Sequence, residues 1–179
     1  MNFLAGIETE IRLSYSAIRS GVPNGMPTVV LHIGTVQTAV ASGNSIEPDG
    51  IIVLNIGSQK TSTDYFKHIS PTPIEFENAI VDIEDEVTRV RAMIAENSTL
   101  FTTDTAIGAI AHISEIPKQP LLILPLEAVE SVFEQLAAIT LGRPASREKA
   151  LASTTFVATI LILREFMHHL KFSSITVKA

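Results

Sequence analysis

The feature that most limits what this chain can fold into is its longest apolar segment, Ala150 to Leu163. A helix that spans a bilayer needs about 20 apolar residues, so this shorter segment predicts a buried helix instead. The middle of the segment is apolar on every side, which places the helix at the centre of a core. We expect Ser146 to cap this helix and its last turn to lie near Leu170.

Three other segments have the spacing of amphipathic helices. The first covers residues 6–19, with Ile7, Ile11, Tyr15 and Ile18 on one stripe. The second begins with the capping-box pattern "TPIE" at 72–75. Its apolar stripe continues at steps of four and three through Phe76, Ile80, Ile83, Val87, Val90 and Ile94. A third helix is predicted from Leu126 to Ile139, and a shorter one after Asp104, which we expect to be its N-cap.

Strands are predicted between these helices. Residues 28–57 contain three β-branched segments separated by turn residues, which is typical of a three-stranded meander. Residues 98–103 and 173–178 predict two further strands. A meander followed by alternating helices and parallel strands indicates an α/β fold with a mixed five-stranded sheet flanked by helices. We expect residues 1–179 to form one domain.

Composition excludes several functions. The net charge of -6 argues against nucleic acid as a ligand, because proteins that bind phosphate backbones carry a basic face. The chain has no cysteine, which excludes disulfides and thiolate sites. We expect no membrane span, no secretory leader and a cytoplasmic location. Apolar residues are 46% of the chain and charged residues 18%, so either the core is unusually large or a partner covers apolar surface.

The helix over 6–19 contains "IETEIRLSYSAIRSG", which resembles the segment "G-x-E-E-A-R-L-x-Y-x-G-V" of the exopolyphosphatase and guanosine pentaphosphate phosphohydrolase (Ppx/GppA) family. The resemblance extends over nearly the whole chain and points to the second actin-like domain of that family, which has a ribonuclease H-like fold. It implies that Glu10 is the catalytic carboxylate that orients the attacking water. The alternative is that Glu10 and Arg12 are exposed helix charges.

The segment "VVLHIGTVQTAVASG" resembles the family's phosphate hairpin, "D-I-G-G-G-S-T-E-L". The resemblance implies phosphate-binding roles for Gly34, Thr35 and Thr38. His32 stands where the family has aspartate, and we expect a plain core or rim histidine. Val36 replaces a glycine, and its β-branched side chain crowds the space of a phosphate. The hairpin is therefore a degenerate version of the family's phosphate loop.

The second phosphate loop of the family, "V-G-x-G-G-T-x-x-x-L-A", corresponds to "STLFTTDTAIGAIAHI", in which only Thr105 matches. Asp104 in this turn repels phosphate by about 1 kcal/mol at contact. The segment from Leu151 to the C-terminus also follows the family's spacing, without its arginine and aspartate. The neighbours His168 and His169 point about 100° apart on a helix, so the pair cannot chelate together and we expect no metal site and no cofactor.

Two functions follow from the resemblance. In the family the ligand lies in a cleft between two actin-like domains, of which this sequence resembles one. The first hypothesis is a stand-alone, non-catalytic domain that acts by self-association, as a homo-oligomer, or by binding a protein partner. The alternative is a polyphosphate or guanosine polyphosphate phosphohydrolase whose second wall comes from a partner chain. A small-molecule binding role of another kind stays open.

Overall fold

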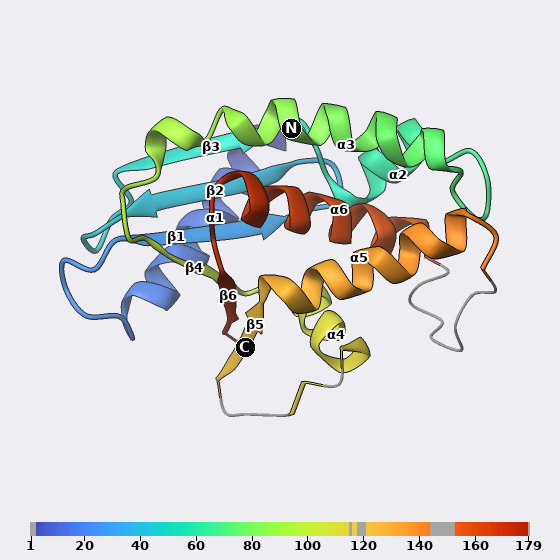
Figure 1. The fold of residues 1–179 in the computed structure, drawn as a ribbon. Helices are drawn as coiled ribbons and strands as arrows, with labels where there is room; N and C mark the ends of the chain where they lie inside the picture. The colour runs from blue at the N-terminus through green and yellow to red at the C-terminus, as the bar shows by residue number, and fades with distance from the viewer. Residues whose placement is uncertain (1–2, 115, 118–120, 144–152, 179) are drawn as a thin grey trace.

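We describe residues 3–114, 116–117, 121–143 and 153–178 of a computed structural model, in which a six-stranded mixed sheet carries helices on both faces (Figure 1). The elements in chain order are α1 (Phe3–Arg19), β1 (Thr28–Ile33), β2 (Thr38–Gly43), β3 (Gly50–Leu54), α2 (Ser58–Tyr65), α3 (Pro73–Thr88), the 3₁₀ turn η1 (Arg91–Met93), β4 (Thr99–Thr102), α4 (Thr105–Ile113), β5 (Leu122–Pro125), α5 (Leu126–Thr140), α6 (Thr154–His169) and β6 (Ser174–Val177).

The strand order is β3-β2-β1-β4-β6-β5. The predicted meander is confirmed, since β1, β2 and β3 pair antiparallel. The two predicted parallel strands are confirmed as β4 beside β1 and β6 beside β4. The prediction of five strands is wrong by one, because β5 pairs antiparallel with β6 at the edge. It has four residues and runs directly into α5, so its apolar side chains are not separated from those of the helix in the sequence.

One face of the sheet is covered by α1, which lies over β1, β2 and β3. The predicted stripe is confirmed: Ile11, Tyr15 and Ile18 are fully buried. The last residue of this helix, Arg19, is also buried. Its guanidinium donates hydrogen bonds to the carbonyls of Met26, Pro23 and Asn44 and to the Thr28 hydroxyl. The same side chain therefore ties the loop after α1 to the β2–β3 turn.

The other face carries α2, α3, α5 and α6, with α6 central among them (Figure 1). As expected, most residues of α6 are buried on every side. Ser153 caps this helix by accepting a hydrogen bond from the Phe156 N–H, whereas the predicted cap, Ser146, lies outside the described residues. The capping box of α3 is confirmed between Thr72 and Glu75. Among the helices of the described ranges, none is long and apolar enough to cross a bilayer.

Candidate functional site

Polar side chains gather where β1 and β4 end. These neighbouring strands are parallel, so their carboxyl ends meet at one edge of the sheet. In open α/β sheets ligands bind beyond the carboxyl ends of strands, at such positions. His32 stands near the end of β1, Asp104 follows β4, and α1 brings Glu10 to the same place. The fold therefore collects three chemically reactive groups that are far apart in sequence.

Asp104 is the centre of this group. One oxygen of its carboxylate lies 2.6 Å from His32 Nδ1, and the other accepts a hydrogen bond from the Ile33 N–H at 2.7 Å. The hydrogen bond to Asp104 raises the pKa of His32, and partial burial of the ring opposes that effect. On the other side of the ring, Nε2 lies 3.4 Å from Glu10 Oε2. The imidazole is thus held between two carboxylates at opposite nitrogens, so the three groups cannot ligate one ion together.

The expected capping role of Asp104 is only half correct. Asp104 does occupy the N-cap position of α4, but its side chain makes no capping hydrogen bond. The carboxylate turns back to β1 instead, because the backbone N–H of Ile33 and the ring of His32 offer it a stronger pair of partners. The prediction of His32 as a plain histidine is corrected by the same contact.

The β1–β2 hairpin loop is held against the first turn of α2. Gly34 donates its N–H to the Gln37 carbonyl at 2.9 Å, which closes the loop. The carbonyl of Gly34 accepts from the Ser58 N–H, and that of Thr35 accepts from the amides that follow Ser58. The approach is so close that a Cβ on Gly57 would lie 2.5 Å from the Val36 carbonyl carbon. The amides at this helix N-terminus are therefore bonded to the hairpin.

The structure brings some of the five predicted site residues together: Glu10 and Gly34 both lie beside the His32 ring, and Thr105 follows Asp104. Glu10 is exposed on α1, and Gly34 and Thr35 lie at the hairpin turn. Thr105 is exposed at the first turn of α4. Thr38 is fully buried, and strand alternation directs its side chain to the same face as Val40, away from α1. Its hydroxyl has no hydrogen-bond partner. The roles of these residues toward phosphate stay predictions.

The sequence reasoning missed the pairing of His32 with Asp104. A signal for it was present, because His32 lies near the end of the predicted strand 28–34 and Asp104 directly follows the predicted strand 98–103. What the sequence lacks is the information that the two strands are direct neighbours. The pairing matters because it places a mostly buried carboxylate at the carboxyl ends of β1 and β4.

Comparison with known proteins identifies the fold. No family model and no curated protein matches the chain. Solved structures do match: the Aquifex aeolicus PPX-GPPA enzyme has a TM-score of 0.77 at 20% identity, over 96% of this chain and 59% of the enzyme. An exopolyphosphatase from Cytophaga hutchinsonii has a TM-score of 0.64 at 17% identity, over 95% of this chain and 59% of its own.

The chain therefore spans less than two thirds of the length of these proteins. An exopolyphosphatase-like protein matches in the same way, with a TM-score of 0.70 at 14% identity. At these identities the likeness concerns the fold. The chain has the actin-like ATPase fold of the Ppx/GppA exopolyphosphatase structures, across nearly all of its own length.

Proposed function

We propose that this chain works in the cytoplasm as a non-catalytic actin-like domain that associates with a second copy of itself. The observation that carries this proposal is the use of the backbone amides around the hairpin. Phosphate sites depend on amides and helix N-termini that point at the ligand. Here the N–H groups of Gly34, Ser58, Gln59 and Lys60 all donate to carbonyls of the hairpin itself.

Charge supports the same conclusion. Asp104 and Glu10 flank a single imidazole at the carboxyl ends of β1 and β4. A phosphate group brought to contact with either carboxylate is repelled by about 1 kcal/mol in water, and by more where water is excluded. The exposed Val36 also occupies the turn, with 53% of its surface accessible. We infer that the hairpin, whose neighbouring amides are bonded to its own carbonyls, lacks the preorganised positive potential that phosphoryl transfer requires.

An uncovered apolar surface supports association. On this face α1 lies over β1 to β3 and Phe101 of β4 packs against the cluster beneath it, whereas no helix of the described residues covers the part formed by β6 and β5. Leu121 and Ile123 alternate with the core residues Leu122 and Leu124, so they point to this face, where each is about half exposed. Leu13, on the flank of α1, is 66% exposed. Exposed apolar side chains such as these are commonly buried by a second subunit.

One observation favours a second candidate, a phosphoric anhydride hydrolase completed by a partner chain. Glu10 remains exposed and stands beside His32 at the ends of β1 and β4. A carboxylate in such a position can orient a water molecule toward a phosphate that is held by other groups. In this candidate the missing phosphate donors belong to the partner.

Light scattering tests the proposed association. We expect a molar mass of twice 19.3 kDa for the purified chain, and a monomer for Ile123→Asp. The matched control is Ile69→Asp, because Ile69 is 94% exposed in the α2–α3 connection and its replacement should leave the dimer intact. A monomer at all concentrations, or a dimer unaffected by Ile123→Asp, contradicts the proposed mode of association.

The same samples are then melted with and without pyrophosphate and assayed for phosphate release from polyphosphate. Pyrophosphate at about 100 times its dissociation constant raises the melting temperature of a protein that binds it by about 5–10 °C. We expect no rise and no release. A rise that disappears in Glu10→Gln would support the hydrolase instead.

A further inference from the structure

A second group of titratable side chains lies on the other side of the sheet from Glu10 and His32, where α3 packs on α6. It consists of Glu84 from α3 and of Glu165 and His169 from α6, and their ligand atoms all lie within 4.8 Å of one another. Glu165 and His169 are four residues apart, so both project from the same side of the helix. Glu84 then faces this pair across the helix–helix contact.

Two of the three distances in this cluster match those of a tetrahedral metal site. His169 Nε2 lies 3.2 Å from Glu84 Oε1 and 3.2 Å from Glu165 Oε2. Ligands bonded to zinc at about 2.0–2.1 Å in a tetrahedron lie about 3.3–3.4 Å from one another. Both distances to the imidazole are therefore already close to the spacing that such an ion imposes, and the two carboxylate oxygens lie within 4.8 Å of each other.

Glu165 provides an independent indication that a ligand belongs here. Its side chain is only 1% exposed, and one oxygen pairs with Arg164 Nη1 at 2.5 Å. The other oxygen, Oε2, faces the cluster and has no hydrogen-bond partner. His169 Nε2 is hydrogen-bonded to Glu84 and carries at most one proton, so it cannot serve both carboxylates well. A buried carboxylate oxygen that has no hydrogen-bond donor is stabilised by a cation.

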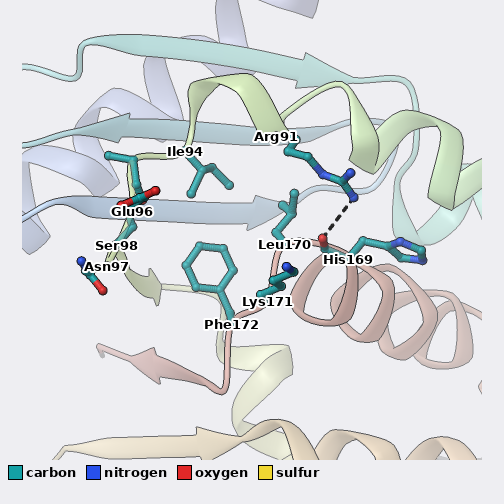
Figure 2. Close-up of a pocket in the computed structure, with 10 residues that line it drawn as sticks. Arg91, Ile94, Glu96, Asn97, Ser98, His169, Leu170, Lys171 and Phe172 are labelled. Carbon is teal, nitrogen blue, oxygen red and sulfur yellow. Dashed lines mark hydrogen bonds between the residues drawn. The ribbon is translucent and has the colours of Figure 1, made fainter.

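The surroundings suit an ion with three protein ligands. Arg164 is held over the Phe133 ring at 4.5 Å, which fixes the Glu165 oxygen that the ion does not use. Arg91 donates to the His169 carbonyl, which ties the end of α6 to the segment after α3 (Figure 2). His169 also lines the neighbouring pocket, and Figure 2 shows that its imidazole points away from Phe172, on the far side of that pocket. Glu84 is 40% exposed, which leaves room for a water molecule as fourth ligand.

We propose that Glu84, Glu165 and His169 form a binding site for a divalent transition-metal ion of the zinc type. One imidazole and two carboxylates favour such an ion over Mg²⁺ and Ca²⁺, which take oxygen ligands in larger number. The site joins α3 to the central helix α6. Metal binding therefore stabilises the fold, and it does so without involving the hairpin or the carboxyl ends of β1 and β4.

Calorimetric titration of the chelator-treated protein with ZnCl₂ tests the site. We expect one ion per chain, and a rise in melting temperature of about 5–10 °C when Zn²⁺ exceeds its dissociation constant about 100-fold. In Glu84→Gln and His169→Gln the affinity should fall by more than about 10–100-fold, which is the loss that removal of an outer-shell partner alone produces. MgCl₂ should give no saturable heat.

Two matched controls use the neighbouring pair His168 and Glu130, whose atoms lie 3.7 Å apart outside the cluster. His168→Gln and Glu130→Gln should bind Zn²⁺ as the parent chain does. Co²⁺ supplies a second readout, since its visible absorption is strong only in tetrahedral coordination, and this signal should vanish in His169→Gln. Because Glu84 lies partly in solvent, Glu84→Gln is expected to fold, and circular dichroism verifies it.

The competing explanation is a protonated His169 that bridges two carboxylates with no metal. It predicts no saturable Zn²⁺ heat and no tetrahedral Co²⁺ spectrum in the parent chain. Either result overturns the site, and so does unchanged Zn²⁺ affinity in both Glu84→Gln and His169→Gln. None of these outcomes depends on whether the chain forms a dimer or binds phosphate.

Discussion

The molecule contains two groups in which one histidine stands between two carboxylates, and the two differ in which ring atoms are used. His32 meets Asp104 at Nδ1 and Glu10 at Nε2. His169 meets Glu84 and Glu165 at the same atom, Nε2. The first arrangement gives each carboxylate its own nitrogen. The second gives two carboxylates one nitrogen and leaves a buried oxygen of Glu165 without a hydrogen bond.

Residue type alone therefore does not decide what such a group does. Around His32 both ring nitrogens face carboxylates of the protein itself, which agrees with the proposed non-catalytic domain. Around His169 one carboxylate oxygen remains in need of a cation, which is why we propose a metal site. The difference comes from the elements that carry the carboxylates. The carboxylates on α1 and on the β4–α4 turn lie on two sides of the His32 ring, whereas those on α3 and α6 lie at one edge of the His169 ring.

The largest effect is expected from removing the inner partner of His32. Asp104→Ala should reduce the free energy of unfolding by about 3 kcal/mol, since it removes a charge-assisted hydrogen bond and leaves the Ile33 N–H unpaired. Asp104→Asn keeps an acceptor for that N–H and should lose less. Urea unfolding of the three proteins measures the difference. Equal stability of Asp104→Ala and the parent chain would mean that the hydrogen bonds of Asp104 to His32 and to the Ile33 N–H do not stabilise the fold.

A smaller effect is expected from forcing the hairpin away from α2. Gly57→Ala places a Cβ 2.5 Å from a backbone atom of Val36, so the free energy of unfolding should fall by about 1–3 kcal/mol. The control is Gly6→Ala in α1, where a Cβ has nothing within 4 Å and should stabilise the helix by about 0.5–1 kcal/mol. If both variants have the same stability, the close packing of hairpin and helix is refuted.

The pH dependence sharpens the comparison further. The hydrogen bond to Asp104 raises the pKa of His32 above the unfolded value of about 6.5. This contribution to stability is fully present below that value and is lost as the pH rises through the folded pKa. An NMR titration of the imidazole should show the raised pKa, and Asp104→Asn should lower it. A His32 that titrates identically in both proteins would speak against the pair.

The smallest effects are expected from the outer carboxylates in metal-free protein. Glu84 and Glu10 are 40% and 65% exposed, so Glu84→Gln and Glu10→Gln should each change the free energy of unfolding by less than about 1 kcal/mol. With Zn²⁺ present the two variants should separate, because only Glu84→Gln loses the stabilisation by the ion. Thermal melting of both variants with and without Zn²⁺ is the measurement. Loss of that stabilisation in Glu10→Gln would mean that the ion binds beside His32 and not at His169.

Much of the fold could be predicted because its signals are local. The stripe of α1, the capping box of α3 and the alternation in β1 to β3 are each contained in a short segment. The missed helix α2 is mostly polar and has only two fully buried residues, Thr61 and Ser62, so it gives no apolar stripe. The missed strand β5 is too short to show alternation. Both elements are defined by what they pack against.

The candidate sites were harder to predict, because their residues meet only after folding. Asp104 and His32 are 72 residues apart in sequence, and Glu84 and Glu165 come from different helices. Glu165 and His169 did offer a local signal, as two ligand types one helical turn apart in the segment predicted to be a helix. The sequence reasoning considered His168 with His169 and predicted no metal site. Nothing local indicated that Glu84 would complete the set.

The position of β6 has a consequence for the order in which this protein acquires its structure during synthesis. This strand, Ser174–Val177, is inserted between β4 and β5, and the helix before it, α6, fills the core. A nascent chain that ends before residue 154 lacks α6, so its meander and other helices have no central helix to pack on. It also lacks β6, so one edge of β4 is unpaired. Domains often begin to fold from the N-terminus as they emerge. In this protein, completion of the sheet waits until β6 has been synthesised, after all the other strands of the sheet.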